Sequence, residues 1–521
     1  MSAPRPLLPW IVTGLLVLSP GRASAQLGGS PDTTTLFPMG PPSLLWAPAN
    51  PAAVPLTVKP PQPPTPTDFH PGSRGLAYGE TLLGLLIPWV FNEYVSKYKD
   101  ITRTSPTRWK ENISEGLLWD DNHFHVNMLL HPYSGSLSFA AGRSNGYNFE
   151  RSVFFSAVGS AFWECCGESH RPSPGDFITT TFGGVLLGEI LHRWTNQILN
   201  HRNGPPPNGW WEVPVAVLSP VRTFSRWALD RFGATAKDFK APDRWAVHTK
   251  TGVGLNPFRV FQEVDYTYGD VVPLTDRSRP FEHFETAVEL SKGGGTQIIQ
   301  RVQARGNLWA RRLAFIPTCL VSSGSGGPSS CLVYWGNIVP FLGFDYINND
   351  AYEFGGQSLG LAAFVTIGQY PHGTYGSLAL DGHGMFGSVK SEHASRAQQL
   401  HDERSERDRE YDITGATGWN LSGIVRWGNL HLSGFYRRDR HRVINGSNYK
   451  AASSNHLTTL LGGTARYKFW GRLGAGVEYR RYHRTSQFDT SFEPLPINQT
   501  DNRFSLFLTL DAVRPLGLFV F

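Results

Sequence analysis

The stretch LGGTARYKFWGRLGAGVEYR, residues 461–480, decides the fold of this chain. Apolar and polar side chains alternate over residues 461–469, and the alternation returns over residues 473–480 after a Trp470-Gly471 turn. A period of two is that of a half-buried strand, and two such runs around a tight turn predict a β-hairpin. One side of each run is apolar and aromatic while the other carries charge, which is typical of a strand between lipid and a polar lumen.

The same alternation recurs along the second half of the chain, in residues 284–290, 298–308, 419–427, 430–436 and 506–512. Several of these runs end in aromatic residues, where the interfacial girdle of a membrane barrel would lie. Strands of about 9 to 11 residues at this spacing predict a transmembrane antiparallel β-barrel of about 10 to 12 strands over residues 258–521. A soluble β-sandwich also alternates, but its strands are shorter, at about 5 to 6 residues.

The other end of the chain has the three parts of an export signal: Arg5, an apolar core over residues 7–18, and the small-residue site Ala23-Ser24-Ala25. We therefore predict a cleavable signal peptide, residues 1–25, and location in the outer membrane of a Gram-negative bacterium. Residues 82–91 form the longest later apolar run, which is interrupted by Pro88 and is shorter than the roughly 18 residues that a spanning helix needs.

Composition fits this class of protein: 521 residues, 40% hydrophobic and 13% aromatic, with 55 glycines. The net charge of +6 is small, so it argues against nucleic acid as a partner and is compatible with anionic lipid headgroups. Expected partners are outer-membrane lipids and, during biogenesis, the barrel-assembly machinery, because residues 517–521 resemble its C-terminal recognition signal. The fold class is α+β: a Pro-rich tether (26–74), an α-helical domain (75–200), a connector (201–257) and the barrel (258–521).

Polar and small residues are concentrated within the helical domain. The runs are His131-Pro132-Tyr133-Ser134-Gly135, Arg143-Ser144-Asn145-Gly146, Trp163-Glu164 and Pro172-Ser173 followed by Asp176. Together they resemble a bacterial family of unknown function, DUF3943, whose members pair such a helical segment with an outer-membrane-like C-terminal half. The resemblance implies an architecture and no activity.

These runs supply the candidate site residues. As catalytic groups we consider the acid/base candidates His131, Glu164, Glu168 and Glu189 and the nucleophile candidates Ser134 and Ser144. As binding groups we consider Asp120, His131, Arg143, Asn145, Asp176 and Arg193. The alternative is that these residues have structural roles. A buried glutamate could form an ion pair with Arg143 or Arg193, and Ser173-Pro174-Gly175-Asp176 could begin a helix.

Metal and disulfide signals are weak. Glu189 and His192 have the spacing of helical di-iron sites, but such sites need two of these pairs, so we expect no metal and no cofactor. Cys319 and Cys331 flank a Gly/Ser-rich segment and could staple a hairpin, whereas Cys165 and Cys166 are interpreted as small apolar residues. Residues 388–412 are too charged for lipid and predict a long extracellular loop.

Small residues also predict how two helices pack. Ser152, Ser156 and Ser160 form one stripe, and Gly184 and Gly188 form another on a later helix. Such stripes let helices approach closely, so we expect a close-packed helix pair.

Two classes of function are compatible with these patterns. The first is a non-enzymatic outer-membrane protein with a helical domain at the periplasmic mouth of the barrel or inside it, used in transport, lipid handling or envelope organisation. The second is an outer-membrane enzyme that acts on lipid or lipopolysaccharide through a His/Glu/Ser site. The sequence favours the first, because that interpretation needs only the patterns described above.

Overall fold

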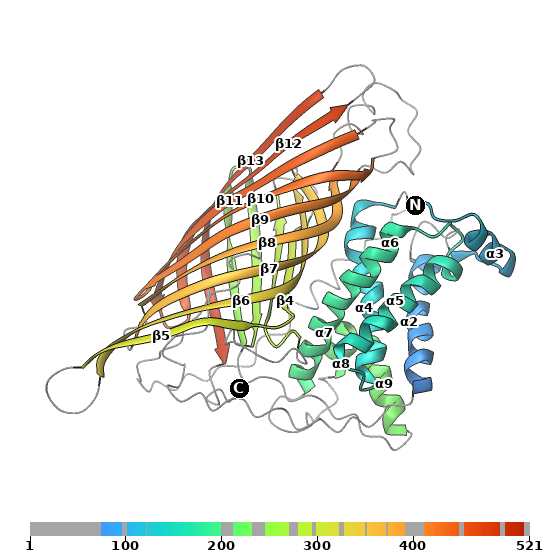
Figure 1. Ribbon diagram of the computed structural model, residues 1–521, viewed down its shortest axis with the longest axis horizontal. Coiled ribbons are helices and arrows are strands. Elements are labelled where there is room, and N and C mark those ends of the chain that lie inside the picture. Colours follow the sequence, from blue (N-terminus) through green and yellow to red (C-terminus); the bar gives the residue numbers. More distant parts are fainter. Residues whose placement is uncertain are drawn as a thin grey trace.

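The computed structural model describes residues 74–95, 102–120, 122–199, 212–231, 245–269, 280–293, 298–321, 328–349, 352–370, 374–390, 411–446, 453–489 and 495–514. The predicted signal peptide (1–25), nearly all of the tether (26–73) and the C-terminal recognition signal (517–521) lie outside these residues. Within them, a helical domain is followed by an antiparallel β-barrel, as predicted (Figure 1).

The helical domain runs past the predicted boundary at residue 200, because two further helices pack onto it. Its elements are α2 (Arg74–Tyr94), α3 (Pro106–Ser114), η3 (Val126–Leu130), α4 (His131–Ser144), α5 (Phe149–Phe162), η4 (Trp163–Gly167), α6 (Pro174–Ile178), η5 (Thr179–Gly183), α7 (Gly184–Leu199), α8 (Glu212–Leu218) and α9 (Pro220–Arg231), where η marks a π-helical turn. Among these described helices, none is both long enough and apolar enough to cross a membrane.

The strands are longer than predicted and begin earlier, at Trp245 rather than at residue 258. They are β1 (Trp245–Leu255), β2 (Phe258–Tyr268), β3 (Phe284–Lys292), β4 (Ile299–Asn307), β5 (Arg311–Val321), β6 (Pro328–Asn349), β7 (Tyr352–Tyr370), β8 (Thr374–Lys390), β9 (Tyr411–Trp427), β10 (Leu430–Asn445), β11 (Ser453–Trp470), β12 (Leu473–Asp489) and β13 (Leu495–Arg514). The predicted loop 388–412 therefore loses residues at both ends to β8 and β9, and residues 391–410 lie outside the described part.

The strands close into a ring. Strands that are consecutive in sequence are hydrogen-bonded to each other except β4 and β5; in addition β1 pairs with β13, and β4 pairs with β6. The long strand β6 pairs with β5 over residues 328–338 and with β4 over residues 341–347. The strands β4 and β5 therefore occupy a single position in the barrel wall. The 13 strands thus occupy 12 positions around the barrel, in agreement with the predicted number of strands.

The lumen is filled by charged side chains that meet across it. Arg480 of β12 contacts Glu289 of β3 and Glu263 of β2 at 2.6 and 2.7 Å, and all three are at most 5% exposed. Further along the barrel, ion pairs join Arg305 to Asp381, Arg437 to Asp345, Arg466 to Asp511, Arg301 to Glu263, and Lys250 to both Glu263 and Glu478. The barrel interior is therefore occupied by its own side chains.

The opposite side chains of the same strands form an apolar outer band. Trp427 and Trp470 are 73% and 75% exposed at the rim where short turns join the strands, and Trp419, Tyr479 and Phe504 mark the far edge. Along β9 the eight steps from residue 419 to residue 427 span about 27 Å at ~3.4 Å per residue, which suits a tilted strand crossing a hydrocarbon layer. Leucine, valine and isoleucine side chains fill the band between these aromatic rings.

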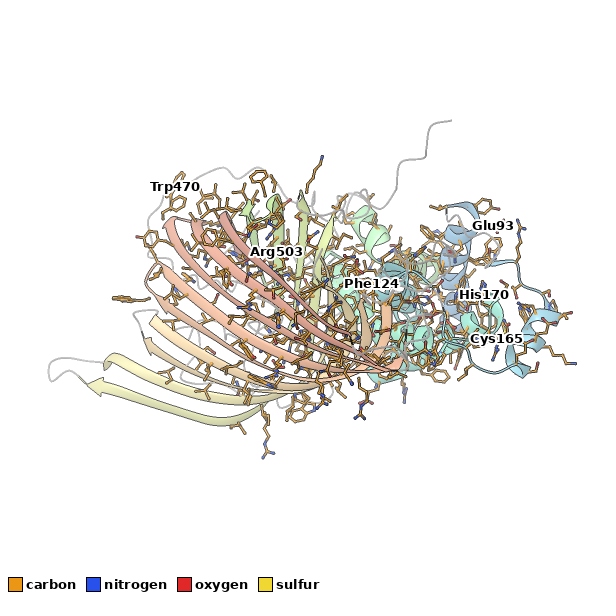
Figure 2. The ribbon with its side chains drawn as sticks, turned by 90° about the horizontal axis from the view of Figure 1, so that it is seen from above. Glu93, Phe124, Cys165, His170, Trp470 and Arg503 are labelled. Carbon is orange, nitrogen blue, oxygen red and sulfur yellow. A yellow bond between two sulfur atoms is a disulfide. The ribbon has the colours of Figure 1, made fainter. Side chains whose placement is uncertain are left out.

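The helical domain packs against the outer face of this wall and not inside the barrel (Figures 1 and 2). Phe344 and Tyr346 of β6 point away from their lumen-facing neighbour Asp345 and join a buried cluster with Met128 and Ile190 of the helices. Figure 2 shows Phe124 of this cluster at the junction, with Cys165 and His170 on the far side of the helical domain. The expected placement at the mouth or in the lumen is replaced by a lateral one.

Close helix packing is confirmed, but the partners differ from those expected. A Cβ on Gly135 of α4 would lie 1.8 Å from the Thr180 carbonyl oxygen, and one on Gly184 would lie 2.6 Å from the Gly135 Cα. The glycines of α7 thus approach α4, while α5 contributes Ser156, whose hydroxyl donates to the Gly135 and Thr181 carbonyls. The serine stripe of α5 and the glycine stripe of α7 therefore both pack against α4, so that three helices are in contact instead of two.

The cysteines also depart from expectation. Cys165 and Cys166, interpreted from sequence as small apolar residues, form a vicinal disulfide in η4. The backbone register of β5 and β6 sets Cys319 directly opposite Cys331, and their side chains lie outside the described part. The two cysteines are neighbours in the chain within the π-helical turn η4, and the sequence pattern alone did not indicate a disulfide between them.

Candidate functional site

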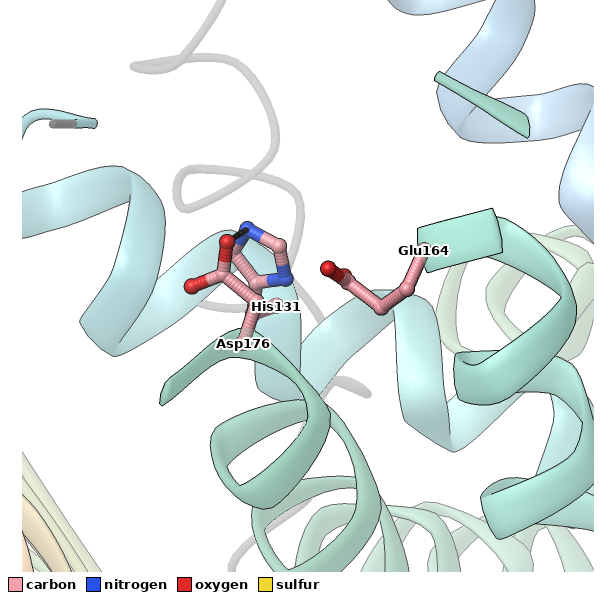
Figure 3. A group of neighbouring side chains, drawn as sticks. All are labelled: His131, Glu164 and Asp176. Carbon is pink, nitrogen blue, oxygen red and sulfur yellow. Dashed lines mark ion pairs between the residues drawn. The ribbon is translucent and has the colours of Figure 1, made fainter. Parts of the chain in front are cut away.

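A buried histidine and two carboxylates from three helical segments meet in the helical domain: His131, Glu164 and Asp176 (Figure 3). One ligand-type atom from each lies within 4.8 Å of the others, and His131 Nε2 is 3.7 Å from Asp176 Oδ2. The three residues are 9%, 3% and 1% exposed. The cluster is therefore closed to bulk water.

Local structure orients the imidazole. His131 is the first residue of α4, and Pro132 fits the first turn, where its missing N–H costs nothing. The Thr180 hydroxyl lies 2.8 Å from His131 Nδ1. Because Nδ1 is engaged, Nε2 is the nitrogen that faces Asp176 and the cluster.

The two carboxylates are positioned by one helix start. Ser173 is the N-cap of α6 as predicted, and its hydroxyl accepts from the Asp176 N–H at 3.2 Å. The Ser173 N–H in turn donates to Glu164 Oε2 at 2.8 Å. Asp176 occupies the predicted third helical position, but its carboxylate turns into the cluster.

Two further acidic residues border the cluster. Asp120 accepts from the Ser173 hydroxyl at 3.2 Å and from Asn127 Nδ2 at 3.0 and 3.1 Å. Glu168 is 7% exposed, and its backbone carbonyl accepts from Asn112 Nδ2 of α3 at 3.1 Å. Asp120, His131, Glu164, Glu168 and Asp176, all named from sequence, are thus gathered in one place.

The protonation states follow from burial. Burial raises the pKa of Glu164 to about 8, although the Ser173 N–H favours its charged form, and Asp120 adds a further rise. The pKa of Asp176 lies well above its usual range because of burial and then of Asp120, Glu164 and Glu168. The pKa of Glu168 is raised by burial and by Glu164 and Asp120, while burial lowers the pKa of His131 to about 4. Burial therefore favours the neutral form of the imidazole and of these three carboxyl groups.

The charge of these carboxylates is not balanced by basic side chains. Within the described part of the chain, no arginine or lysine pairs with Glu164, Glu168 or Asp176. Glu164 Oε1 and both carboxylate oxygens of Asp176 are buried without a hydrogen-bond partner there. Buried carboxylates are normally paired or bound to a metal, so this cluster differs from the ordinary ion pairs of the same protein.

Three π-helical turns surround the cluster. The turn η3 leads into His131, η4 contains Glu164, and η5 contains Thr180. A π-turn inserts an extra residue into a helix and re-aims the side chains around it, and such turns occur frequently at functional sites.

Other candidates lie elsewhere. Glu189 is held by Arg143 at 2.8 and 3.1 Å and by Arg193 at 2.8 Å, which is the structural ion pair considered from the sequence. Asn145 donates to Glu80 of α2. Ser144 ends α4, thirteen residues after His131, or roughly 20 Å at ~1.5 Å per residue. Neither Ser134 nor Ser144 bonds to His131 among the described contacts, so the serine-nucleophile arrangement is not assembled.

The cluster is tied to the barrel through residues that the sequence analysis missed. Asn127 Nδ2 donates to the Tyr411 hydroxyl of β9 at 2.7 Å, and this hydroxyl donates to the Asn122 carbonyl at 2.9 Å. Trp119 stacks on Phe386 of β8 with 6.5 Å between ring centroids. Thr180, Asn127 and Tyr411 have no motif of their own, because their roles depend on contacts between distant segments.

Tyr411→Phe tests this tie. The variant keeps the ring but loses both hydrogen bonds, each with a net value of about 0.5–1.5 kcal/mol. We expect faster cleavage of the helical domain by protease in the folded, membrane-inserted protein. Tyr436→Phe, whose ring packs on Trp419 of the barrel at 5.2 Å, is the control and should leave the cleavage rate unchanged. Equal rates for both variants would contradict the assigned role of the Tyr411 hydroxyl.

Comparisons with known proteins give one family match and several similar solved structures. A search of the curated proteins finds no match. Among solved structures, the chain is similar to in-vitro folded OmpT, an outer membrane protein of Vibrio cholerae (9% identity, 51% of this chain and 98% of that one, TM-score 0.20). It is also similar to the outer membrane channel DcaP of Acinetobacter baumannii (9% identity, 52% and 96%, TM-score 0.20).

A refined porin structure gives 10% identity, 51% and 99% coverage and a TM-score of 0.18. Scores this low carry no argument about function. Residues 116–221, which include the whole cluster, match the family model DUF3943, a domain of unknown function, and this confirms the resemblance seen in the motifs.

Proposed function

We propose that this is an outer-membrane protein whose closed barrel anchors a helical domain that handles lipid at the membrane. The observation that supports this proposal is the position of the helical domain on the outer, lipid-facing side of the barrel wall. A domain in that position is next to lipid and away from the lumen. Of the three roles considered from the sequence, transport fits worst and lipid handling fits best.

The closed lumen argues against passage of solutes. Charges from strands three or four places apart in the ring approach within 3 Å, as in Arg480 with Glu289 and Arg305 with Asp381. Each is a charge-assisted hydrogen bond, which holds both side chains in place. A solute would have to break several of these contacts in succession.

The helical domain carries apolar surface of its own. Leu82, Leu86 and Val90 recur on one face of α2 and are 51%, 52% and 46% exposed, and Phe182 of η5 is 52% exposed. Contiguous exposed apolar surface marks a protein or membrane contact. Because η5 contacts β7 and the outer face of the barrel is itself apolar, we infer that lipid covers Phe182 and the adjoining wall, and that the barrel holds the domain in place.

The cluster lies beyond the apolar band. Tyr411, which is linked to the cluster through Asn127, is eight residues beyond Trp419 on β9. At ~3.4 Å per residue this is about 27 Å further along the tilted strand than the edge of the band, on the side away from the short turns.

Bilayer conductance tests the closed barrel. The purified full-length protein in planar bilayers is expected to give no current steps above the empty membrane, with a porin as positive control. Stable, repeated conductance steps would contradict the closed lumen and would support transport instead.

Site-specific photocrosslinking tests the contact with lipid. A photoreactive side chain at Phe182 is expected to yield adducts with phospholipid or lipopolysaccharide in outer-membrane vesicles. The same group at Ser114, an exposed polar position on α3, serves as the control and should yield none. Absence of lipid adducts at Phe182 and at Leu86 would overturn the lipid-facing assignment.

An enzyme that acts on lipid is the second candidate. It is favoured by the meeting of His131 with Glu164 and Asp176, because a neutral imidazole beside carboxyl groups can serve as an acid/base pair. Comparing the lipid and lipopolysaccharide composition of cells that express wild type or His131→Gln tests it. An identical lipid composition at equal protein levels would count against catalysis and leave the non-enzymatic role.

A further inference from the structure

The cluster of His131, Glu164 and Asp176 has the donor set of a cation site, and this inference does not depend on the proposed lipid function. Its carboxylates are buried and lack basic partners, in contrast to Glu189 in the same domain, which is neutralised by Arg143 and Arg193. Leaving carboxylate oxygens buried and unpaired is costly unless they are protonated or bind a cation.

The donor atoms are close enough to share one ion. In a zinc site each nitrogen or oxygen ligand is about 2.0–2.2 Å from the metal, so two ligands are at most roughly 4.4 Å apart. The three donors lie within 4.8 Å of one another, and the His131 Nε2 to Asp176 Oδ2 distance is already 3.7 Å. Small side-chain rotations would bring all three into ligand range.

The surrounding residues hold the donors as the outer ligands of a metal site do. Thr180 engages His131 Nδ1 at 2.8 Å and leaves Nε2 for the ion. The Ser173 N–H engages Glu164 Oε2 at 2.8 Å and leaves Oε1 without a partner among the described residues. Such contacts to the far atom of each ligand fix its orientation, and their loss typically weakens metal binding by about 10- to 100-fold.

An independent observation points to a ligand. Asp176 is 1% exposed, and one of its carboxylate oxygens lies beside the His131 ring in Figure 3. Neither oxygen has a hydrogen-bond partner within 3.5 Å in the described part, and the nearest groups are the His131 imidazole and the carboxyl of Asp120. The N-cap that holds the backbone of Asp176 is fully explained by Ser173, so the cap does not account for this carboxylate.

We propose that His131, Glu164 and Asp176 bind one divalent first-row transition cation, with Asp120 and Glu168 as adjacent acidic groups. The imidazole favours zinc, iron or cobalt over magnesium or calcium, while the two carboxylates also suit manganese. With three protein ligands, such an ion keeps an open position for water or for an anionic group. The site was missed from sequence because its ligands are separated by 33 and 12 positions and follow no standard motif.

Metal titration tests the proposal. Untagged full-length protein, used because the chain already has 17 histidines, is stripped with a chelator and titrated with Zn²⁺, and bound metal is measured by elemental analysis. We expect one tightly bound ion per chain. Asp176→Asn and Glu164→Gln keep the side-chain shape and are expected to weaken binding at least 10-fold, and Thr180→Val by about 10-fold.

Co²⁺ supplies a readout that a merely structural role would not produce. Wild type loaded with Co²⁺ is expected to show visible absorption bands that His131→Gln lacks. Glu150→Gln, an exposed carboxylate at the start of α5, is the control and should bind like wild type. Folding of each variant is followed by protease resistance of the helical domain, and Thr180→Val removes no charge, so it provides a second route if Asp176→Asn misfolds.

Two results would overturn the proposal. One is wild type that binds no stoichiometric Zn²⁺, Co²⁺ or Mn²⁺, in which case the carboxyls are simply protonated. The other is full binding by folded Asp176→Asn, Glu164→Gln and Thr180→Val, which would place the ion elsewhere. Neither result bears on the lipid adducts expected at Phe182, so failure of this proposal and failure of the proposed function are distinguishable.

Discussion

Arg480→Ala is expected to destabilise the barrel by about 3–5 kcal/mol, because it removes three buried, charge-assisted hydrogen bonds from one ion-pair network. Arg480 is within 2.9 Å of carboxylate oxygens of Glu263, Glu289 and Glu478, so alanine removes a cation that these three buried acids share. The acids then depend on the remaining cations of the network, Lys250, Arg259 and Arg301. The measurement is the midpoint of urea-induced unfolding in lipid vesicles, followed by tryptophan fluorescence.

Arg481→Ala provides a matched control for this experiment. Arg481 is the next residue on β12 but is exposed on the outer face, where a single arginine contributes little to stability. We expect its unfolding midpoint to remain close to that of wild type. If both variants shift the midpoint equally, the lumen network does not stabilise the barrel in the way that the contacts suggest.

Glu189→Ala is expected to destabilise the helical domain by a similar amount, about 3–5 kcal/mol, while the barrel stays folded. Glu189 is fully buried and neutralises both Arg143 and Arg193, so its loss leaves two buried guanidinium groups without their carboxylate. Limited proteolysis should then release fragments from residues 74–231 and spare the strands.

Glu150→Ala is the control for this variant, because Glu150 is an exposed acid in the first turn of α5. Its loss removes a favourable charge near a helix N-terminus, worth about 0.3–1 kcal/mol, and should leave the domain resistant to protease. A resistant Glu189→Ala protein would mean that the ion pair is dispensable, as is found where a buried pair can be relaxed or rehydrated.

The barrel was largely predictable because its strands carry a local signal. The runs 284–290, 461–469 and 473–480 all fall within strands, the run 298–308 exceeds β4 by one residue at each end, and the Trp470-Gly471 turn occurs as expected. The first strand was missed because its outer face mixes Thr249 and Thr251 with Val247 and Val253, which weakens the alternation. Strand lengths were underestimated because β8 to β13 continue past the apolar band into polar sequence.

The lateral position of the helical domain could not have been predicted. Phe344 and Tyr346, which face the helices, alternate with lumen-facing residues in the same way as Leu359 and Leu361, which are exposed. An apolar outward residue has the same pattern whether lipid or a protein helix covers it. Only the three-dimensional contacts distinguish the two cases.

The candidate site was partly predictable. His131, Glu164 and Asp176 were each identified from polar motifs, and the helix start at Ser173 was identified from its capping sequence. Their convergence was not predictable, because it depends on the crossing of α4 with the α6–η5–α7 run and on π-turns that leave no recognised sequence mark. Glu189 and Arg143 come from the same polar motifs, but they form a structural ion pair away from the cluster.

The arc of barrel wall that the helices cover also has a consequence for assembly order. The covered strands run from β2 through β9, whereas the seam that joins the first and last strands, β1 to β13, lies outside this arc. The helices can therefore dock on a growing, still open sheet as soon as β9 is in place. Pairing of β1 with β13 then displaces no docked helix. The helical domain, which precedes the strands in the chain, can therefore serve as a template on which the sheet forms.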